Sequence, residues 1–215
     1  MVCRRGKGFE TSPAPNRNRS YEDHVMAEKA LPSPEVLRQL LRYEPETGKL
    51  FWLHRTQQEF DTLGRFSVEH KCNWWNAMYA NTEASTLSHR GYYRIRLKRR
   101  DYSSHRVIWA MVTGSWPDMM VDHINRIPSD NRWVNLRLAT PTQNHWNRSK
   151  SEGKSSCYKG VLWSKSDSIW RSSISVYGKP HPLGEFSTQE KAAQAYDAAA
   201  KKHFGDYAVL NFREE

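Results

Sequence analysis

The segment from Val121 to Lys150 limits what this chain can fold into, because an Asp-His pair, a run of turn residues and a helix start follow one another within it. Thr140 is a suitable N-cap, Pro141 suits the first helical position, and Gln143 stands where a capping box needs it. The pattern predicts a strand, an irregular loop, a short strand and then a helix. Such a unit can hold a few polar side chains in fixed positions.

The polar residues of this segment are types that can hydrolyse a phosphodiester. We expect Asp122 and His123 to end the first strand and to face Asn144 on the helix. The Asp122 carboxylate and the Asn144 carbonyl are hard oxygen ligands that suit Mg²⁺ or Mn²⁺. A histidine side chain such as that of His123 can take a proton from water. A cation with few protein ligands keeps positions open for a phosphate oxygen and a leaving group.

Asp122-His123, Asn135 and Asn144 resemble the HNH endonuclease motif, in the variant with asparagine at the last metal position. The resemblance extends to His105-Arg106, Gly114–Pro117 and Asn131-Arg132. It implies a ββα-metal fold with a core at about 119–149. It also implies that His123 is the general base, that Asp122 and Asn144 hold the metal, and that Asn135 braces the loop carrying His123. An isolated Asp-His pair is more often a turn, but its context favours the nuclease interpretation.

The composition indicates a polyanionic partner. The chain has 215 residues, a net charge of +10 and nine tryptophans, and this combination makes nucleic acid the first expectation. A merely soluble basic protein is the alternative. The sequence has no apolar run near the ~20 residues that span a bilayer and no apolar core after its basic start. We therefore expect a cytoplasmic protein, in the host cell if phage-encoded, that does not bind membranes.

The cysteines argue against two kinds of structural cross-link. Cys3, Cys72 and Cys157 are odd in number and far apart. This spacing is unlike a disulfide framework or a Cys₄ zinc site, so we expect no structural zinc.

The N-terminal part predicts a short α+β region. Residues 1–30 are polar and lack a hydrophobic period, so we expect a disordered tail. Ser33 caps a predicted helix whose apolar stripe includes Leu41 and which stops before Pro45. A turn then leads into a predicted strand at Leu50–Leu53. The stretch 56–71 is predicted to be a long loop.

The segment Tyr92–Arg100 alternates and predicts a strand with one apolar and one cationic face. The cationic face consists of Arg94, Arg96 and Lys98. Beside a nuclease motif such a face is a suitable track for phosphates, and we favour this over a solvated edge strand guarded by its charges. Arg137, just after Asn135, is a further expected DNA contact.

Three side chains before the motif have two possible roles each. Trp74 and Trp75 can stack on bases or pack in the core, and we expect core packing for at least one of them. His105 begins a predicted helix, 105–113, that ends at Gly114. His105 either touches phosphate in the active site or is a hydrogen-bonded structural histidine.

A linker is predicted at 149–156, where the residues are small, polar and flexible. It separates a nuclease domain, 31–148, from a C-terminal domain, 157–213. The C-terminal domain is predicted to have three short strands and one helix, the strands being Tyr158–Trp163, Ile169–Tyr177 and Pro182–Phe186. Ser187 and Glu190 predict a capping box at the start of that helix.

The C-terminal domain resembles an AP-two/ERF DNA-binding domain through Tyr158–Val161, Trp170-Arg171, Leu183–Phe186, Ala192–Asp197 and Leu210–Phe212. The resemblance implies that the sheet reads the major groove. By strand position, the residues expected to face DNA are Lys159, Trp163, Arg171, Ser173, Ser175, Tyr177 and Lys179. Plant relatives place arginines, a glutamate and a tryptophan where this chain has Leu162, Ser164, Ser173, Ser175, Pro180 and Pro182. Backbone anchoring with weak base recognition therefore stays open, as does a protein-contact module.

The expected fold class is α+β: an N-terminal α+β region leads into the ββα-metal motif, and a separate three-stranded sheet with one helix follows. The expected function is a metal-dependent endonuclease that uses Mg²⁺ (or Mn²⁺) to hydrolyse phosphodiester bonds in double-stranded DNA. The resemblance indicates a homing endonuclease of a phage or mobile element, targeted by its C-terminal domain and monomeric in solution. One alternative is a non-catalytic, sequence-specific DNA-binding regulator with a degenerate nuclease domain. Another is an RNA-directed nuclease or RNA-binding protein.

Overall fold

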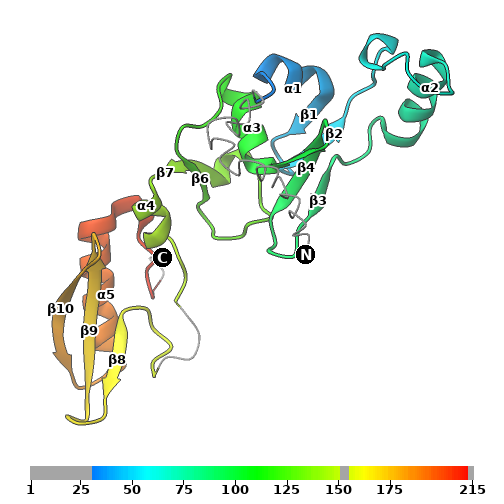
Figure 1. The fold of residues 1–215 in the computed structure, drawn as a ribbon. Helices are drawn as coiled ribbons and strands as arrows, with labels where there is room; N and C mark the ends of the chain where they lie inside the picture. The colour runs from blue at the N-terminus through cyan, green and yellow to red at the C-terminus, as the bar shows by residue number, and fades with distance from the viewer. Residues whose placement is uncertain (1–30, 151–154, 213–215) are drawn as a thin grey trace, which may run out of the picture. The chain divides into compact units, whose positions relative to one another are not determined.

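A computed structural model of the chain describes residues 31–150 and 155–212 (Figure 1). The described residues form an α+β fold with two two-stranded and two three-stranded antiparallel sheets. By their contacts, the residues from Ser33 onward group into one unit. The predicted tail, 1–30, and part of the predicted linker lie outside the described residues. Within the described ranges, no helix is long and apolar enough to cross a membrane.

The first hairpin begins earlier than expected. Helix α1 (Pro34–Leu40) starts at Ser33, whose side chain accepts from the Val36 amide, as predicted. The prediction that the helix extends through Leu41 is wrong, because Leu41 is extended and opens β1 (Leu41–Glu44), which pairs with β2 (Lys49–Trp52). Leu41 is buried. Because a buried leucine suits a helix as well as a strand, its hydrophobicity alone did not distinguish the two.

The cationic strand is shorter than predicted. Strand β4 (Tyr93–Leu97) lies between β3 (Ser85–Leu87) and β5 (Arg100–Ser103), with alternate residues buried as expected. The prediction that the strand continues to Arg100 is wrong. Lys98 and Arg99 have φ of 46° and 66° and form the turn into β5. Lys98 therefore lies at a turn and not on the strand face.

A helix occupies part of the segment predicted to be a loop. The short 3₁₀ helix η2 (Gln57–Glu59) is followed by α2 (Val68–Tyr79), which Ser67 caps. Trp75 packs edge-on against Trp52 at 5.7 Å, whereas Trp74 is 54% exposed. Trp75 is partly buried against Trp52, but neither Trp74 nor Trp75 belongs to a hydrophobic core of the described residues, so the expected core packing is not found.

Helix α3 (Ser104–Thr113) carries the centre of the first core. Its buried residues pack with leucines of α1, β1 and β2 and with the apolar face of β4. The helix ends at Gly114, as predicted, and the Arg38 Nε donates to the Met111 carbonyl at 2.8 Å, which ties α1 to α3.

The ββα unit has the predicted order. Strand β6 (Met120–His123) pairs with β7 (Leu136–Ala139) after the short 3₁₀ helix η3 (Trp133–Asn135), and α4 (Pro141–Trp146) follows. The Thr140 side chain accepts from the Gln143 amide, and the Gln143 side chain accepts from the Thr140 amide, so the predicted capping box is confirmed. This unit positions the candidate site.

The C-terminal sheet has the order β10 (Lys179–Phe186), β9 (Ile169–Val176), β8 (Val161–Ser164). Figure 1 shows α5 (Gln189–Phe204) running along this sheet, and the 3₁₀ helix η4 (Gly205–Tyr207) follows it. The predicted cap at Ser187 is wrong, because Thr188 accepts from the Lys191 amide. Both residues can cap a helix, so composition did not separate them.

The strand register corrects one expected DNA-facing residue. Trp163 lies opposite Trp170, and their rings are 4.9 Å apart. Residues directly opposite each other share a face. Trp163 is therefore on the face of Trp170, and Leu162 is the residue opposite Arg171.

Gly160 gives a test of how tightly α5 packs. A Cβ at Gly160 (φ +77°) would lie 1.9 Å from the ring of the buried Tyr196, whereas at Gly178 (φ +78°) no described atom lies within 4 Å. Both alanine variants carry the left-handed backbone cost of about 1–2 kcal/mol. We expect Gly160→Ala to lower the free energy of unfolding clearly more than Gly178→Ala. Urea unfolding of the full chain measures both, and equal losses would contradict this packing.

Candidate active site

The ββα unit brings Asp122, His123 and Asn144 to one cleft. Two adjoining cavities of about 240 Å³ each share these residues and Tyr92. One cavity is bounded further by Arg126, Pro128, Asn147, Arg148 and Ser149, and the other by Arg90, Arg94, Ser103, His105, Met120 and Val121. The structure therefore places together the three residues that the sequence selected for metal binding and base catalysis.

Asp122 is held by charged and amide donors. Its side chain is buried, and the Arg137 Nε and Nη2 both lie 3.0 Å from Oδ2. The Asn147 Nδ2 lies 3.1 Å from Oδ1 and 2.9 Å from Oδ2. A carboxylate offers about four lone pairs. Because Asn147 is the one described residue that bonds Oδ1, this oxygen keeps the capacity to accept from, or to ligate, another partner.

Arg137 is an ion-pair partner of Asp122 and not an exposed cation. Its side chain is 15% exposed, and its Nη1 donates to the Asp206 carbonyl at 2.6 Å. Its guanidinium also lies 3.9 Å from the Tyr207 ring centroid. The sequence placed Arg137 among the DNA contacts, but the β6–β7 register pairs it directly with Asp122. That cross-strand pairing of opposite charges is the signal that was missed.

His123 is buried and bonded through one ring nitrogen. Its Nε2 lies 2.9 Å from the Asn131 Oδ1. Its ring packs edge-on against His105 at 5.1 Å and lies 6.0 Å from the Tyr92 ring. The sequence noted Asn131 only as a neighbour of the motif, so its contact with His123 is a residue role that the sequence did not give.

His105 lies at the wall of the cleft. It is 9% exposed, and its Nδ1 has no hydrogen-bond partner among the described residues. Burial, with nearby His123 and Arg106, lowers the pKa of His105 to about 3. The ring is therefore neutral near neutral pH. The sequence left two roles open for His105: a phosphate contact or a hydrogen-bonded structural histidine. The structural role would need a hydrogen bond, and Nδ1 makes none with the described residues.

Asn135 braces the loop between β6 and β7. Its Oδ1 accepts from the Asn125 amide at 2.9 Å, and its Nδ2 donates to the Asn125 Oδ1 at 3.0 Å and to the Asp130 carbonyl at 2.7 Å. The Arg132 guanidinium beside Asp130 lowers the pKa of that carboxyl to about 2, so the loop also carries a charged pair. These bonds close the loop that follows His123.

Asn144 and Asn147 have different environments on α4 and just after it. Asn147 is buried and also donates to the His123 carbonyl at 2.8 Å. Asn144 is partly exposed, and its Nδ2 lies 3.7 Å from the Met120 sulfur. The Asn144 carbonyl oxygen is therefore available to the cleft, whereas the Asn147 amide is committed to Asp122. The donor set of Asp122 and Asn144 fits a hard cation.

Four arginines surround the cleft. Arg94, predicted as a phosphate contact, lines it together with Arg90, Arg126 and Arg148. Arg96, on the same strand, has a side chain 71% exposed and lies outside these cavities, as does Lys98. Arg126 and Arg148 lie outside the helices and strands. No helical or strand period in the sequence could therefore predict that they line the cleft.

The outer face of the C-terminal sheet is exposed, but carboxylates neutralise part of its positive charge. Arg171, Ser173 and Ser175 are exposed, yet the Arg171 guanidinium lies 2.9 Å from both Glu185 and Asp167. The other expected contacts of this region lie at its hairpin turn, where Tyr177 and Lys179 are exposed.

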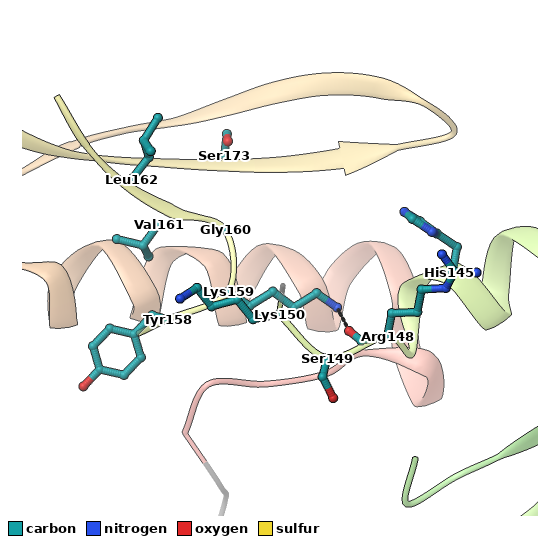
Figure 2. Close-up of a pocket in the computed structure, with 10 residues that line it drawn as sticks. All are labelled: His145, Arg148, Ser149, Lys150, Tyr158, Lys159, Gly160, Val161, Leu162 and Ser173. Carbon is teal, nitrogen blue, oxygen red and sulfur yellow. Dashed lines mark hydrogen bonds between the residues drawn. The ribbon is translucent and has the colours of Figure 1, made fainter. Parts of the chain in front are cut away.

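Lys159 caps a helix instead of projecting outward. Its Nζ donates to the Trp146 carbonyl at 2.7 Å and to the Arg148 carbonyl at 2.8 Å, and burial lowers its pKa to about 8. Lys159 lines a cavity of about 400 Å³. Figure 2 shows a dashed hydrogen bond next to Arg148, which is the bond from the Lys159 Nζ to the Arg148 carbonyl. Lysine at such a position satisfies the free carbonyls of a helix end. The prediction that Lys159 faces DNA by strand position is not what the structure shows.

Asn147 and Asn144 give a matched pair for stability. Asn147→Ala removes the Nδ2 donor that both oxygens of the buried Asp122 carboxylate and the His123 carbonyl share. We therefore expect a loss of about 1–3 kcal/mol in the free energy of unfolding. Asn144→Ala is expected to change it by about 0.5 kcal/mol or less, because that amide is half-exposed. Urea unfolding of both variants is the measurement. Equal losses would mean that Asn147 does not support Asp122 as described.

The comparisons with known proteins agree with this site. The profile of the HNH endonuclease family matches residues 102–146, which contain Asp122, His123 and Asn144. An uncharacterized HNH endonuclease, L560 of Acanthamoeba polyphaga mimivirus, is 38% identical over 109 residues, which is 50% of this chain and 56% of the mimivirus protein. Protein 3.8 of Escherichia phage T7 is 32% identical over 105 residues, 48% of this chain and 86% of the phage protein.

The C-terminal region has a different relative. The ethylene-responsive transcription factor WRI1 of Arabidopsis thaliana is 38% identical over 77 residues, which is 30% of this chain and 17% of the plant protein. The match thus spans about half the length of the mimivirus protein and a small part of the plant factor. No solved structure matches the chain. Because the phage protein is covered over most of its length, and the matched profile contains the residues of the cleft, the chain belongs to the HNH endonuclease family.

Proposed function

We propose that this chain is an endonuclease that hydrolyses phosphodiester bonds in double-stranded DNA. The observation that carries the proposal is the single cleft in which Asp122, His123 and Asn144 meet, with arginines on both sides. Buried acid and base groups at a cationic surface are suited to a phosphodiester substrate. Membership of the HNH family and similarity to viral proteins support a nuclease.

The arginines position the DNA backbone. Arg90 and Arg94 line one cavity, and Arg126 and Arg148 line the other, so a strand that passes the cleft meets positive charge before and after the scissile phosphate. Guanidinium groups bind phosphate oxygens through paired N–H donors. These contacts hold the substrate without selecting its sequence.

Asp122 and Asn144 are the proposed ligands of a divalent cation, Mg²⁺ or Mn²⁺. HNH nucleases generally depend on a divalent metal. Within the described ranges, no group of three or more His, Cys, Asp or Glu residues is placed to hold a metal, so the proposed set is a single carboxylate with an amide oxygen. Such a cation stabilises negative charge on the phosphate and on the leaving oxygen when bound. Arg137 and Asn147 keep the Asp122 carboxylate oriented for this role.

His123 is the proposed general base. Its imidazole removes a proton from water as the water oxygen forms a bond to phosphorus, and the bond from phosphorus to the leaving oxygen breaks. The leaving oxygen takes up a proton from solvent, and the proton on His123 returns to solvent. The ring is buried in contact with His105 and Tyr92. Asn135 serves this step at a distance, by bracing the loop after His123.

The C-terminal sheet is the proposed targeting module. Similarity to a plant transcription factor supports DNA binding by this region. We propose that Arg171, Ser173 and Ser175 face DNA, with Tyr177 and Lys179 at the hairpin turn. Because Arg171 is paired with two carboxylates, docking relies more on backbone contacts than on base recognition. The proposed organisation is a nuclease domain, 31–148, a linker, 149–156, and a targeting domain, 157–213.

We propose further that the chain is a homing endonuclease of a phage or mobile element and acts as a monomer in the host cytoplasm; its similarity to a mimivirus and a phage protein supports the viral part of this proposal. One observation favours a second function. Both oxygens of Asp122 already accept hydrogen bonds from the chain, as in a purely structural ion pair. A DNA-binding regulator with a degenerate nuclease site is therefore the alternative.

Cleavage of supercoiled plasmid tests the enzyme. With Mg²⁺ we expect conversion to open circles, and EDTA should abolish it. His123→Ala should lower the rate about 10²–10⁴-fold, because the base is lost. His54→Ala is the control, since His54 is exposed and its ring contacts Asn81 outside the cleft.

The products separate the alternatives. Linear product formed without a prior open circle would indicate that two chains act together. Intact plasmid, with retained binding to duplex DNA, would favour the regulator once DNA from the native locus is also left uncut. Preference for single-stranded over duplex competitor would favour an RNA or single-strand substrate.

The cationic rim predicts a salt dependence. Arg126→Ala and Arg148→Ala should each weaken duplex binding and reduce the slope of log Kd against log salt concentration by about one, because each removes one phosphate contact. Arg42→Ala is the control, because Arg42 lies in β1 and pairs with Glu44. Fluorescence anisotropy with a labelled duplex at several salt concentrations measures the slope. Equal slopes for all three variants would exclude this rim from the interface.

A further inference from the structure

We infer that Asn131 is the positioning residue that orients His123, and that the β1–β2 hairpin holds Asn131 in place. The inference rests on the proposed function, because it assigns how the proposed base is directed. It gives the N-terminal hairpin a role in catalysis, although the hairpin contributes no residue to the cleft cavities.

The contact between Asn131 and His123 selects one form of the imidazole. The Asn131 Oδ1 lies 2.9 Å from Nε2, and the two residues are 1% and 5% exposed. An amide oxygen only accepts hydrogen bonds, so Nε2 carries the hydrogen of the neutral ring. Nδ1 is then the unprotonated nitrogen and the atom that takes the proton from water. The contact thus determines both the direction of the ring and the identity of the basic atom.

The backbone of Asn131 is fixed by β1. The Tyr43 hydroxyl donates to the Asn131 carbonyl at 2.9 Å. Burial raises the pKa of Tyr43 to about 12, so the hydroxyl keeps its proton and remains a donor. Tyr43 and Asn131 are 88 positions apart in the sequence, so this hydrogen bond is a long-range contact between β1 and the loop after β6.

The hairpin turn packs directly on the same residue. At Gly48, which has φ of +75°, a Cβ would lie 2.5 Å from the carbonyl carbon of Asn131 and 2.5 Å from the Arg132 amide nitrogen. The turn therefore touches the backbone of Asn131 with no room for a side chain. Together, Tyr43 and Gly48 hold the backbone of Asn131, whose side chain contacts His123.

Asn131 and Asn135 have different roles in the loop. The hydrogen bonds of the Asn135 side chain go to Asn125 and Asp130, and none among the described residues reaches the His123 ring. Asn135 therefore sets the shape of the loop, whereas Asn131 sets the orientation of the ring. The expected loop-bracing role of Asn135 therefore stays, and Asn131 adds a direct contact with the ring.

The first test uses substitutions at Asn131 in the full chain, with plasmid nicking in Mg²⁺. Asn131→Ala should lower kcat at least tenfold and leave KM within twofold, because the substrate contacts of the arginines remain. Asn131→Asp keeps an oxygen facing Nε2 and should restore most of kcat. An unchanged kcat in Asn131→Ala, while His123→Ala abolishes nicking, would overturn the inference and leave the proposed function intact.

The second test compares two glycines. Gly48→Ala and Gly64→Ala both place alanine at positive φ, but no described atom lies within 4 Å of a Cβ at Gly64. Gly48→Ala should lower kcat several-fold, as should Tyr43→Phe, whereas Gly64→Ala should match the wild type. Equal kcat in the two glycine variants and in Tyr43→Phe would show that the hairpin does not hold Asn131.

The third test does not depend on cleavage. Long-range ¹H–¹⁵N spectra of the metal-free, histidine-labelled chain report which nitrogen of each ring carries hydrogen, and His123→Ala identifies the signal of His123. We expect the Nε2–H form in the wild type and a mixture of forms in Asn131→Ala. An Nδ1–H form in the wild type would overturn the inference, even if nicking fails altogether and the proposed function is lost.

Discussion

The ion pair between Asp122 and Arg137 is the interaction on which the site depends. A buried carboxylate is costly without partners, and removing one partner of such a pair commonly costs about 3–5 kcal/mol. Here the pair joins β6 to β7, and Asn147 adds the end of α4 to it. Arg137 also bonds the Asp206 carbonyl, so the same charge cluster reaches the segment that follows α5. The position of Asp122, the candidate metal ligand on β6, thus depends on β7, on the end of α4 and on the segment after α5.

Local chemistry in the sequence was sufficient to predict the ββα unit. Thr140 and Gln143 form the expected capping box, and β6 and β7 flank the expected loop. The turn at Lys98 and Arg99 was not predictable in the same way, because positive φ at two cationic residues is uncommon and glycine or asparagine usually marks such turns. Local preference there was overridden by the pairing of β4 with β5.

Long-range contacts explain what the sequence left unassigned in the site. The types of Asp122, His123 and Asn144 predicted their meeting, but the partners of a buried group depend on residues distant in the chain. The link from Tyr43 to Asn131 and the bond from Lys159 to the end of α4 are of this kind. Arg137 and Lys159 were expected to contact DNA, Lys159 by its strand position, whereas the fold uses both to satisfy backbone carbonyls and, for Arg137, the Asp122 carboxylate.

The aromatic contact at the end of α4 has a consequence for evolution by exchange of modules. Trp146 stacks on Phe204 of α5 at 4.4 Å and belongs to the same apolar cluster as Ile174 and Val176. Helix α4 has six residues, too few to be stable without packing. A different DNA-binding tail grafted after this helix would have to supply a new aromatic partner for Trp146. Exchange of the tail without a matching aromatic partner is therefore expected to destabilise the helix that carries Asn144.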